Sequence, residues 1–220
     1  MICVSLGNRN FQKMAEAARS LEFAEVRIDL CRLTIDQVAR IFSSGNTLVA
    51  TCRPGFFSDA ERGLLLQEAI HSGARYVDIE IDSPTSLREE ILKTAGEEGC
   101  LAIISYHNDD CTPGTVALKD IVRQCFAKGA DLCKVACRCR TVRDMLTVLS
   151  LYGEDGDSQG KMIALGMGEN ASWTRMAAPF LGAPFTYAAL EDSERTAEGQ
   201  LSFQKMRTLF SIMKKEQEER

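Results

Sequence analysis

The chain has 220 residues, of which 45% are hydrophobic and 26% charged, and its formal net charge is -5 at neutral pH. A chain of this length can form one α/β barrel and bury a sizeable core without disulfides or a structural metal. The mildly acidic charge argues against a nucleic-acid-binding protein, which would usually present a basic face. No apolar run reaches the roughly 20 residues of a membrane span, and the first residues lack the pattern of a signal peptide. We therefore expect a cytoplasmic protein with no membrane partner.

Short apolar runs alternate with stretches of helical pattern along the whole chain. The expected strands are 2–6, 25–30, 47–52, 76–81, 101–106, 132–136, 162–165 and 185–189. The expected helices are 11–21, 34–43, 59–72, 86–98, 115–128, 142–151, 171–180 and 200–215. Eight such units predict a parallel sheet that closes into a single (β/α)8 TIM barrel over residues 1–220. An open doubly wound sheet is the main alternative, but no Gly-rich fingerprint follows the first strand.

Two of the expected strands carry ionisable residues at alternate positions. Glu25, Arg27 and Asp29 share one face of the second strand, and Asp78 and Glu80 share one face of the fourth. In a barrel the apolar face meets the helices, so these charged side chains enter the interior, where they are costly unless paired. They form either a structural ion network or part of a polar site.

Three residues lie at or near the ends of strands, where the active sites of such barrels are found. Pro54 ends the third strand and leaves Arg53 at its tip, His107 follows the fifth strand, and Lys134 lies in the sixth. Lysine is rarely buried, and apolar residues flank this one. We expect desolvation to favour the neutral amine, which can attack a ketone or aldehyde while His107 acts as the base. The alternative is a lysine that extends to solvent at the rim.

The last two loops of the expected barrel also carry polar residues. A glycine-containing loop after the seventh strand leads to Arg175. Such a loop can hold a phosphate, or Arg175 can clamp a carboxylate with its planar fork of donors. The segment 191–200 is long for its place and could be a lid that carries Thr196 and Gln200.

Nine cysteines are scattered through apolar stretches. An odd number in this pattern predicts reduced, buried thiols. Cys133, Cys137 and Cys139 lie close together, but no Cys-x-x-Cys pair and no nearby histidine complete a zinc set. We therefore expect no metal site.

Taken together, these residues resemble the type I 3-dehydroquinate dehydratases of the shikimate pathway. The matching segments occur in the family's order and are 25–29, 51–54, 76–80, 105–107, 134–136, 166–168 with Arg175, and 197–200. The resemblance implies that Lys134 forms a Schiff base with the ketone of 3-dehydroquinate. It also implies that His107 removes the adjacent proton and helps the hydroxyl to leave.

The resemblance implies further contacts and properties. Arg175 would bind the substrate carboxylate. The residues that would contact the rest of the substrate are Glu25, Arg27, Arg53, Gln200 and Thr196, the last of which stands where the family often has Ser. Members of the family need no metal or organic cofactor and are frequently homodimers, so we expect no cofactor and a homodimer here.

The sequence departs from the family in two places. After Arg53 some members carry a Glu-Gly-Gly run whose carboxylate orients the histidine, whereas this chain has Pro54-Gly-Phe-Phe-Ser. Glu61 lies further along, and Glu80 on the neighbouring strand is a candidate for that role. The sequence also starts almost directly at the first strand, without an evident hairpin of the kind that covers the barrel floor in longer relatives.

Two other functions fit parts of this pattern. A class I aldolase-type barrel also uses an imine-forming lysine on the sixth strand, but an aldolase of sugar phosphates is expected to bind phosphate at the last two loops. A non-catalytic barrel that binds a shikimate-pathway acid would bind its ligand without turnover.

Overall fold

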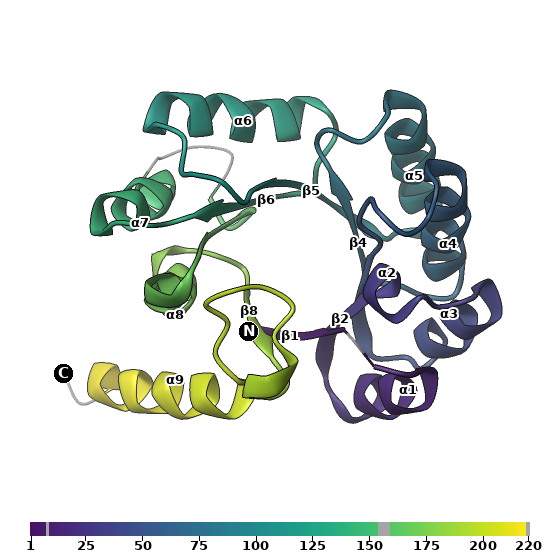
Figure 1. The fold of residues 1–220 in the computed structure, drawn as a ribbon, viewed down its shortest axis with the longest axis horizontal. Helices are drawn as coiled ribbons and strands as arrows, with labels where there is room; N and C mark the ends of the chain where they lie inside the picture. Colours follow the sequence, from purple (N-terminus) through teal and green to yellow (C-terminus); the bar gives the residue numbers. More distant parts are fainter. Residues whose placement is uncertain (8, 154–158, 219–220) are drawn as a thin grey trace.

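The strands of the protein follow one another around a barrel (Figure 1). The structure is a computed structural model and describes residues 1–7, 9–153 and 159–218. In this part of the chain, eight parallel strands pair in the order β7-β6-β5-β4-β3-β2-β1-β8. The strands are β1 (Ile2–Leu6), β2 (Phe23–Arg27), β3 (Thr47–Thr51), β4 (Tyr76–Glu80), β5 (Leu101–Asn108), β6 (Leu132–Arg138), β7 (Met162–Met167) and β8 (Thr186–Ala189). The expected (β/α)8 TIM barrel is confirmed.

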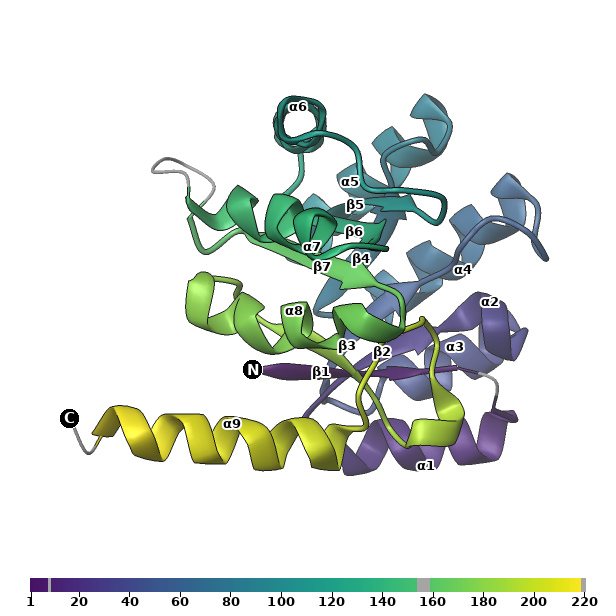
Figure 2. The same ribbon diagram turned by 60° about the vertical axis from the view of Figure 1, so that its left-hand side comes forward.

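Helices follow the strands and surround them on the outside (Figures 1 and 2). They are α1 (Phe11–Ser20), α2 (Ile28–Cys31), α3 (Ile35–Phe42), α4 (Asp59–His71), α5 (Thr85–Glu98), α6 (Thr115–Ala127), α7 (Val142–Leu149), α8 (Ser172–Ala177) and α9 (Phe203–Glu218). Helices α3, α4 and α7 begin at capping boxes headed by Thr34, Ser58 and Thr141. Each box satisfies backbone N–H groups that the first turn of a helix leaves without partners.

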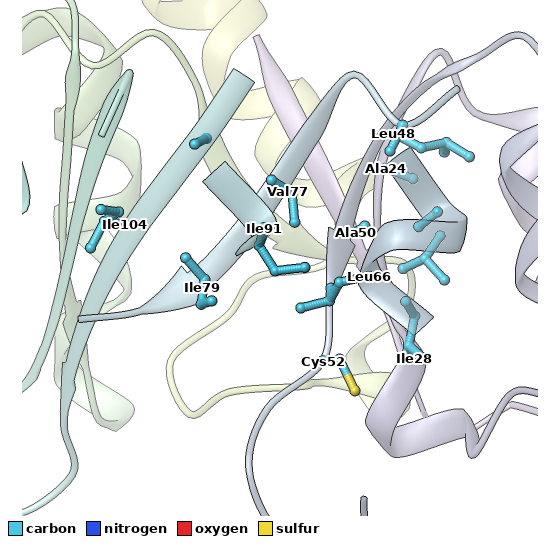
Figure 3. Close-up of a cluster of buried hydrophobic side chains, with 14 of the residues drawn as sticks. Ala24, Ile28, Leu48, Ala50, Cys52, Leu66, Val77, Ile79, Ile91 and Ile104 are labelled. Atoms are coloured by element: carbon cyan, nitrogen blue, oxygen red, sulfur yellow. The ribbon is translucent and has the colours of Figure 1, made fainter. Parts of the chain in front are cut away.

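The outward faces of the strands pack against this ring of helices. Figure 3 shows Ala24, Leu48 and Val77 beside Leu66 of α4 and Ile91 of α5, all in one buried cluster. Because successive side chains on a strand point to opposite faces, this apolar outer face leaves the alternate positions to the barrel interior.

Aromatic rings fill the end of the interior where the strands begin. Phe23 and Tyr76 start β2 and β4, and their ring centroids lie 4.8 and 5.6 Å from that of Phe185, which precedes β8. Tyr187 continues the stack toward the other end, 5.5 Å from Phe185. These rings close the end of the barrel where the strands begin. A ligand can therefore reach the interior from the opposite end, at the carboxyl ends of the strands.

Some boundaries differ from those expected. Strand β2 ends at Arg27, so Asp29 lies in α2 and not on the strand face where we placed it. The expected helix 171–180 is broken into the 3-10 turns Glu169–Ala171 and Ala178–Leu181 around the short α8. Pro179 lacks the N–H that a longer α-helix would need. The last helix starts at Phe203, which leaves Gln200 in the preceding loop.

Two properties of the described residues bear on the class of protein. None of their helices is long and apolar enough to cross a membrane. All nine cysteines carry free thiols, and seven of them are buried.

Candidate active site

A cavity of about 370 Å³ opens at the carboxyl ends of the strands. This size suits a small-molecule ligand. All eight residues predicted from the sequence line it, namely Glu25, Arg27, Arg53, His107, Lys134, Arg175, Thr196 and Gln200. The chain between β8 and α9 crosses this end of the barrel (Figure 2), so strands supply the walls and this segment, 190–202, supplies part of the cover. We call it the lid segment.

The amine of Lys134 lies deep in this cavity. The side chain is buried, and its Nζ donates a hydrogen bond to Oδ2 of Asp78 at 2.9 Å. The same nitrogen lies 3.7 Å from Oε1 of Glu25 and 4.3 Å from the ring centroid of Tyr187. The amine therefore faces two carboxylates and one aromatic ring.

The expectation that apolar walls surround this amine is wrong. Cys133 and Val135, its neighbours along β6, point to the opposite face and pack with the outer core. The groups near Nζ come from other strands and are the carboxylates of Asp78 and Glu25 and the ring of Tyr187. An amine attacks a carbonyl carbon in its neutral form, so the chemistry of this site needs a group that can accept a proton.

Ser105 of β5 allows Lys134 and Asp78 to meet, although β5 separates their two strands. In the strand register Ser105 lies opposite both Lys134 and Glu80. Its small side chain leaves space above it, and its Oγ donates a hydrogen bond to Oδ1 of Asp78 at 2.6 Å. A larger residue at this position would separate the amine from its carboxylate.

Arg53 joins the carboxylates of β4. Its two terminal nitrogens lie 2.6 Å from Oε1 of Glu80 and 3.0 Å from Oδ2 of Asp78. Burial disfavours the charged form of Asp78, yet Arg53 and Lys134 hold its pKa far below the ordinary value. Asp78 therefore stays ionised, and its low pKa makes it a weak base for Lys134.

Glu25 lies on the other side of the amine, on β2. It accepts hydrogen bonds from the hydroxyls of Ser5 and Thr51, the latter at 3.0 Å. Burial opposes its ionisation, but Lys134 and Arg27 together bring its pKa below the ordinary value. Glu25 is thus a fixed negative charge at the wall of the cavity.

His107 stands at the rim beside Glu80. Its Nδ1 lies 2.9 Å from Oε1 of Glu80, a contact that is an ion pair only when the imidazole is protonated. Burial and the charge of Arg53 lower the pKa of His107, while Glu80 opposes this shift. The imidazole is therefore neutral at neutral pH, as a general base must be. Glu61, the other carboxylate that follows Arg53 in sequence, caps α4 instead.

Arg175 enters the cavity from α8, and no carboxylate of the described residues forms an ion pair with it. Its side chain is buried, and its Nε has no hydrogen-bond partner among the described residues. Burial lowers its pKa to about 10, so it remains charged at neutral pH. A buried, unpaired guanidinium is costly, and a bound carboxylate would satisfy it through two parallel hydrogen bonds.

The remaining predicted residues lie at the mouth of the cavity. Arg27 is engaged at both Nε and Nη2 by the carboxylate of Asp29, at 3.0 and 2.6 Å. In the lid segment, the hydroxyl of Thr196 donates to Oγ of Ser5 at 2.7 Å, and Gln200 accepts from the backbone N–H of Thr196 at 2.9 Å. The bond to Ser5 joins the lid segment to β1, and the bond to Gln200 lies within the lid segment.

Several residues around the cavity were missed as site residues. Tyr187 of β8 lies beneath the amine, and its spacing of two residues from Phe185, which precedes β8, was the available signal. Arg138 and Glu198 lie at the mouth as an ion pair. They are 60 residues apart in sequence, and no local pattern connects them.

Two curated relatives of this chain share one activity in their names. A family model described as type I 3-dehydroquinase matches residues 2–217. A 3-dehydroquinate dehydratase of Desulfotalea psychrophila is 30% identical over 96% of each chain. A second one, of Dehalococcoides mccartyi, is 33% identical over 86% of this chain and 84% of its own.

Solved structures agree on the fold. The type I 3-dehydroquinate dehydratase of Clostridium difficile, with covalently modified comenic acid, has a TM-score of 0.85, 21% identity, and coverage of 98% of this chain and 92% of its own. The 3-dehydroquinate dehydratase of Aquifex aeolicus has a TM-score of 0.78 and 25% identity, and the match covers 95% and 96% of the two chains. Since the family model spans residues 2–217 and relatives at 30% identity or more match most of the chain, the protein belongs to the type I 3-dehydroquinase family.

Proposed function

We propose that the protein dehydrates 3-dehydroquinate to 3-dehydroshikimate through a Schiff base on Lys134. The observation that carries the proposal is the cavity in which a buried lysine, a neutral histidine and an unpaired arginine meet. The activity printed for the relatives supports the choice of substrate.

The reaction begins at the ketone of the substrate. Lys134 gives up a proton, and its Nζ attacks the ketone carbon; loss of water then leaves a protonated imine. Because the low pKa of Asp78 makes its carboxylate a weak base, the neutral imidazole of His107 is the group better suited to take protons in this step. Asp78 and Glu25 then offset the positive charge of the imine nitrogen.

The protonated imine is an electron sink for the next step. His107 removes a proton from the carbon next to the imine, and the electron pair forms an enamine. The enamine expels the hydroxyl of the following carbon, which leaves as water with the proton that His107 returns. Water hydrolyses the new imine and releases the unsaturated ketone and the free lysine.

The proposal is tested with purified protein and 3-dehydroquinate. We expect a rise in ultraviolet absorbance from the conjugated enone and, with borohydride, a covalent adduct on the peptide that contains Lys134. Binding without turnover or adduct would favour the non-catalytic barrel. Cleavage of a sugar phosphate with no dehydration would favour the aldolase.

Arg175→Met tests the carboxylate clamp. We expect KM to rise about 10- to 100-fold, because hydrogen bonds to a charged group contribute about 1.5–3 kcal/mol. The free variant should be no less stable than wild type, since the substitution removes a buried charge without a partner. Steady-state kinetics and thermal unfolding measure both effects. Arg175→Lys, which keeps the charge, should recover part of the affinity, and an unchanged KM in Arg175→Met would contradict the clamp.

Glu80→Gln tests the carboxylate that faces His107. Loss of its charge removes the group that opposes the lowering of the His107 pKa. In wild type, activity should fall only as the pH drops below the ordinary histidine value of about 6.5, and in the variant this acid limb should move lower still. We also expect kcat to fall about 10- to 100-fold, part of the ~10²–10⁴ that a general acid–base group contributes.

The control for Glu80 is Glu61→Gln, which removes a helix cap outside the cavity. It should leave the acid limb of the pH–rate profile in place. An acid limb that does not move in Glu80→Gln would show that Glu80 does not act on His107.

Two further predictions concern the whole protein. The cytoplasmic location and the homodimer expected from the sequence stay predictions, supported by the family alone. Cell fractionation and analytical ultracentrifugation of the full chain check them.

A further inference from the structure

An ion pair stands between the cavity and a second hollow outside it. The outer hollow has a volume of about 850 Å³ and shares part of its lining with the cavity. Arg138 at the end of β6 and Glu198 in the lid segment belong to both linings. Their side chains form a hydrogen-bonded ion pair, so a ligand that passes from the hollow to the cavity moves past this pair.

Arg138 is held in place independently of Glu198. Its Nε donates a hydrogen bond to the carbonyl oxygen of Asp109 at 3.0 Å, while both terminal nitrogens face Glu198. The hydroxyl of Thr112 donates to the carbonyl oxygen of Arg138 at 2.8 Å. The guanidinium would therefore keep its place if its acidic partner changed.

Glu198 is positioned by the backbone of the lid segment. The next residue, Gly199, has a φ of +77°, and a Cβ there would lie 2.4 Å from the carbonyl oxygen of Gly168. The lid segment is also tied elsewhere, by Glu194 to Arg9 and by Asp192 to Lys205. The Glu198 carboxylate can leave Arg138 while these ties hold the rest of the segment.

Replacing Glu198 by another anionic partner of Arg138 costs little free energy. The side chain of Arg138 is 31% exposed and that of Glu198 is 58% exposed, and exposed pairs are worth only about 0.2–1 kcal/mol. Another carboxylate can replace Glu198 with the same charge and the same two acceptor oxygens. The unpaired Arg175 lies on the inner side of the pair, in the lining of the cavity alone.

We propose that Arg138 is an outer carboxylate-binding residue for the substrate. Glu198 occupies it in the structure, the carboxylate of an incoming substrate displaces Glu198, and this carboxylate then moves inward to Arg175. This inference rests on the proposed function, because it requires a substrate with a carboxylate.

The test compares two single variants in steady-state dehydration of 3-dehydroquinate. Glu198→Gln removes the competing carboxylate, so kcat/KM should rise. The expected rise is about 1.4- to 5-fold, which is the free energy of an exposed ion pair expressed as a ratio of rates. Arg138→Met removes the anion-binding group, so kcat/KM should fall about 3- to 10-fold, as when one charge of a steering field is lost. In the double variant, Glu198→Gln should give no further rise.

The test depends on the two variants changing kcat/KM in opposite directions. If the pair only ties the lid segment, both variants break the same tie and change kcat/KM in the same direction, which would overturn the proposal. Glu194→Gln is the matched control because it breaks the tie to Arg9, which lines neither the cavity nor the hollow. The control should not reproduce the rise seen in Glu198→Gln; an equal rise would overturn the proposal.

The same experiment separates the two proposals. If the wild-type protein dehydrates 3-dehydroquinate and both variants change kcat/KM in the same direction, only the role of Arg138 is refuted. Wild-type protein without dehydratase activity refutes the proposed function and this inference with it. Thermal unfolding of each variant shows that a changed kcat/KM does not come from loss of fold.

Discussion

Lys134→Ala abolishes turnover of 3-dehydroquinate and the borohydride-trapped adduct. The variant lacks the nitrogen that would become the imine, and no other amine is among the residues that line the cavity. We expect kcat to fall below detection, because without the imine no electron sink stabilises the carbanion-like step. Peptide mass mapping after borohydride treatment checks the adduct, and Lys93→Ala, at an exposed lysine on α5, serves as the control with a normal adduct. A trapped adduct in Lys134→Ala would place the reactive amine elsewhere.

The same variant should change stability in a pH-dependent way. Lys134 is the main group that holds the pKa of Glu25 down against burial, so without it Glu25 is a buried carboxylate with weaker compensation. A carboxylate with a lowered pKa stabilises the fold above its unfolded pKa, and this stability is lost as the pH falls. The variant should therefore lose free energy of unfolding mainly at neutral pH, and the difference from wild type should shrink below about pH 4. Urea unfolding at several pH values measures it.

The fold was predictable because each strand carries its own signal. Apolar residues at alternate positions of 23–27 and 76–80 face the helices, and the polar positions between them face the interior. The prediction was wrong where tertiary contacts determine the path of the chain. Asp29 continues the alternation in sequence, but the chain turns after Arg27, and the paired side chains of Arg27 and Asp29 meet across that turn.

The site was predictable as a set of residues but not as an electrostatic arrangement. Each predicted residue faces the cavity because of its place on its own strand or loop. The surroundings of Lys134 are made by Asp78 and Glu25 on other strands, and residues next to Lys134 in sequence say nothing about them. The partner of His107 was left open for the same reason, since Glu80 lies 27 residues earlier and reaches it only through the pairing of β4 with β5.

His107→Ala should separate imine formation from dehydration. The variant keeps the amine of Lys134, and water or buffer takes its proton in place of His107 at a lower rate, so borohydride should still trap an adduct with 3-dehydroquinate, formed more slowly. Removal of the proton next to the imine loses its base, and we expect kcat to fall about 10²- to 10⁴-fold. Free imidazole added at neutral pH contains a neutral fraction that can act as the missing base, so it should restore part of the rate.

The matched control is His71→Ala, the only other histidine of the sequence, which lies exposed in the last turn of α4 and outside the cavity. It should turn over substrate at the wild-type rate. The decisive comparison is within the His107 variant, between the amount of adduct and the rate of enone formation. If both disappear together, His107 acts before the imine exists and Lys134 depends on it to lose a proton. If the rate is normal, another group removes the proton, and the histidine has no part in the chemistry.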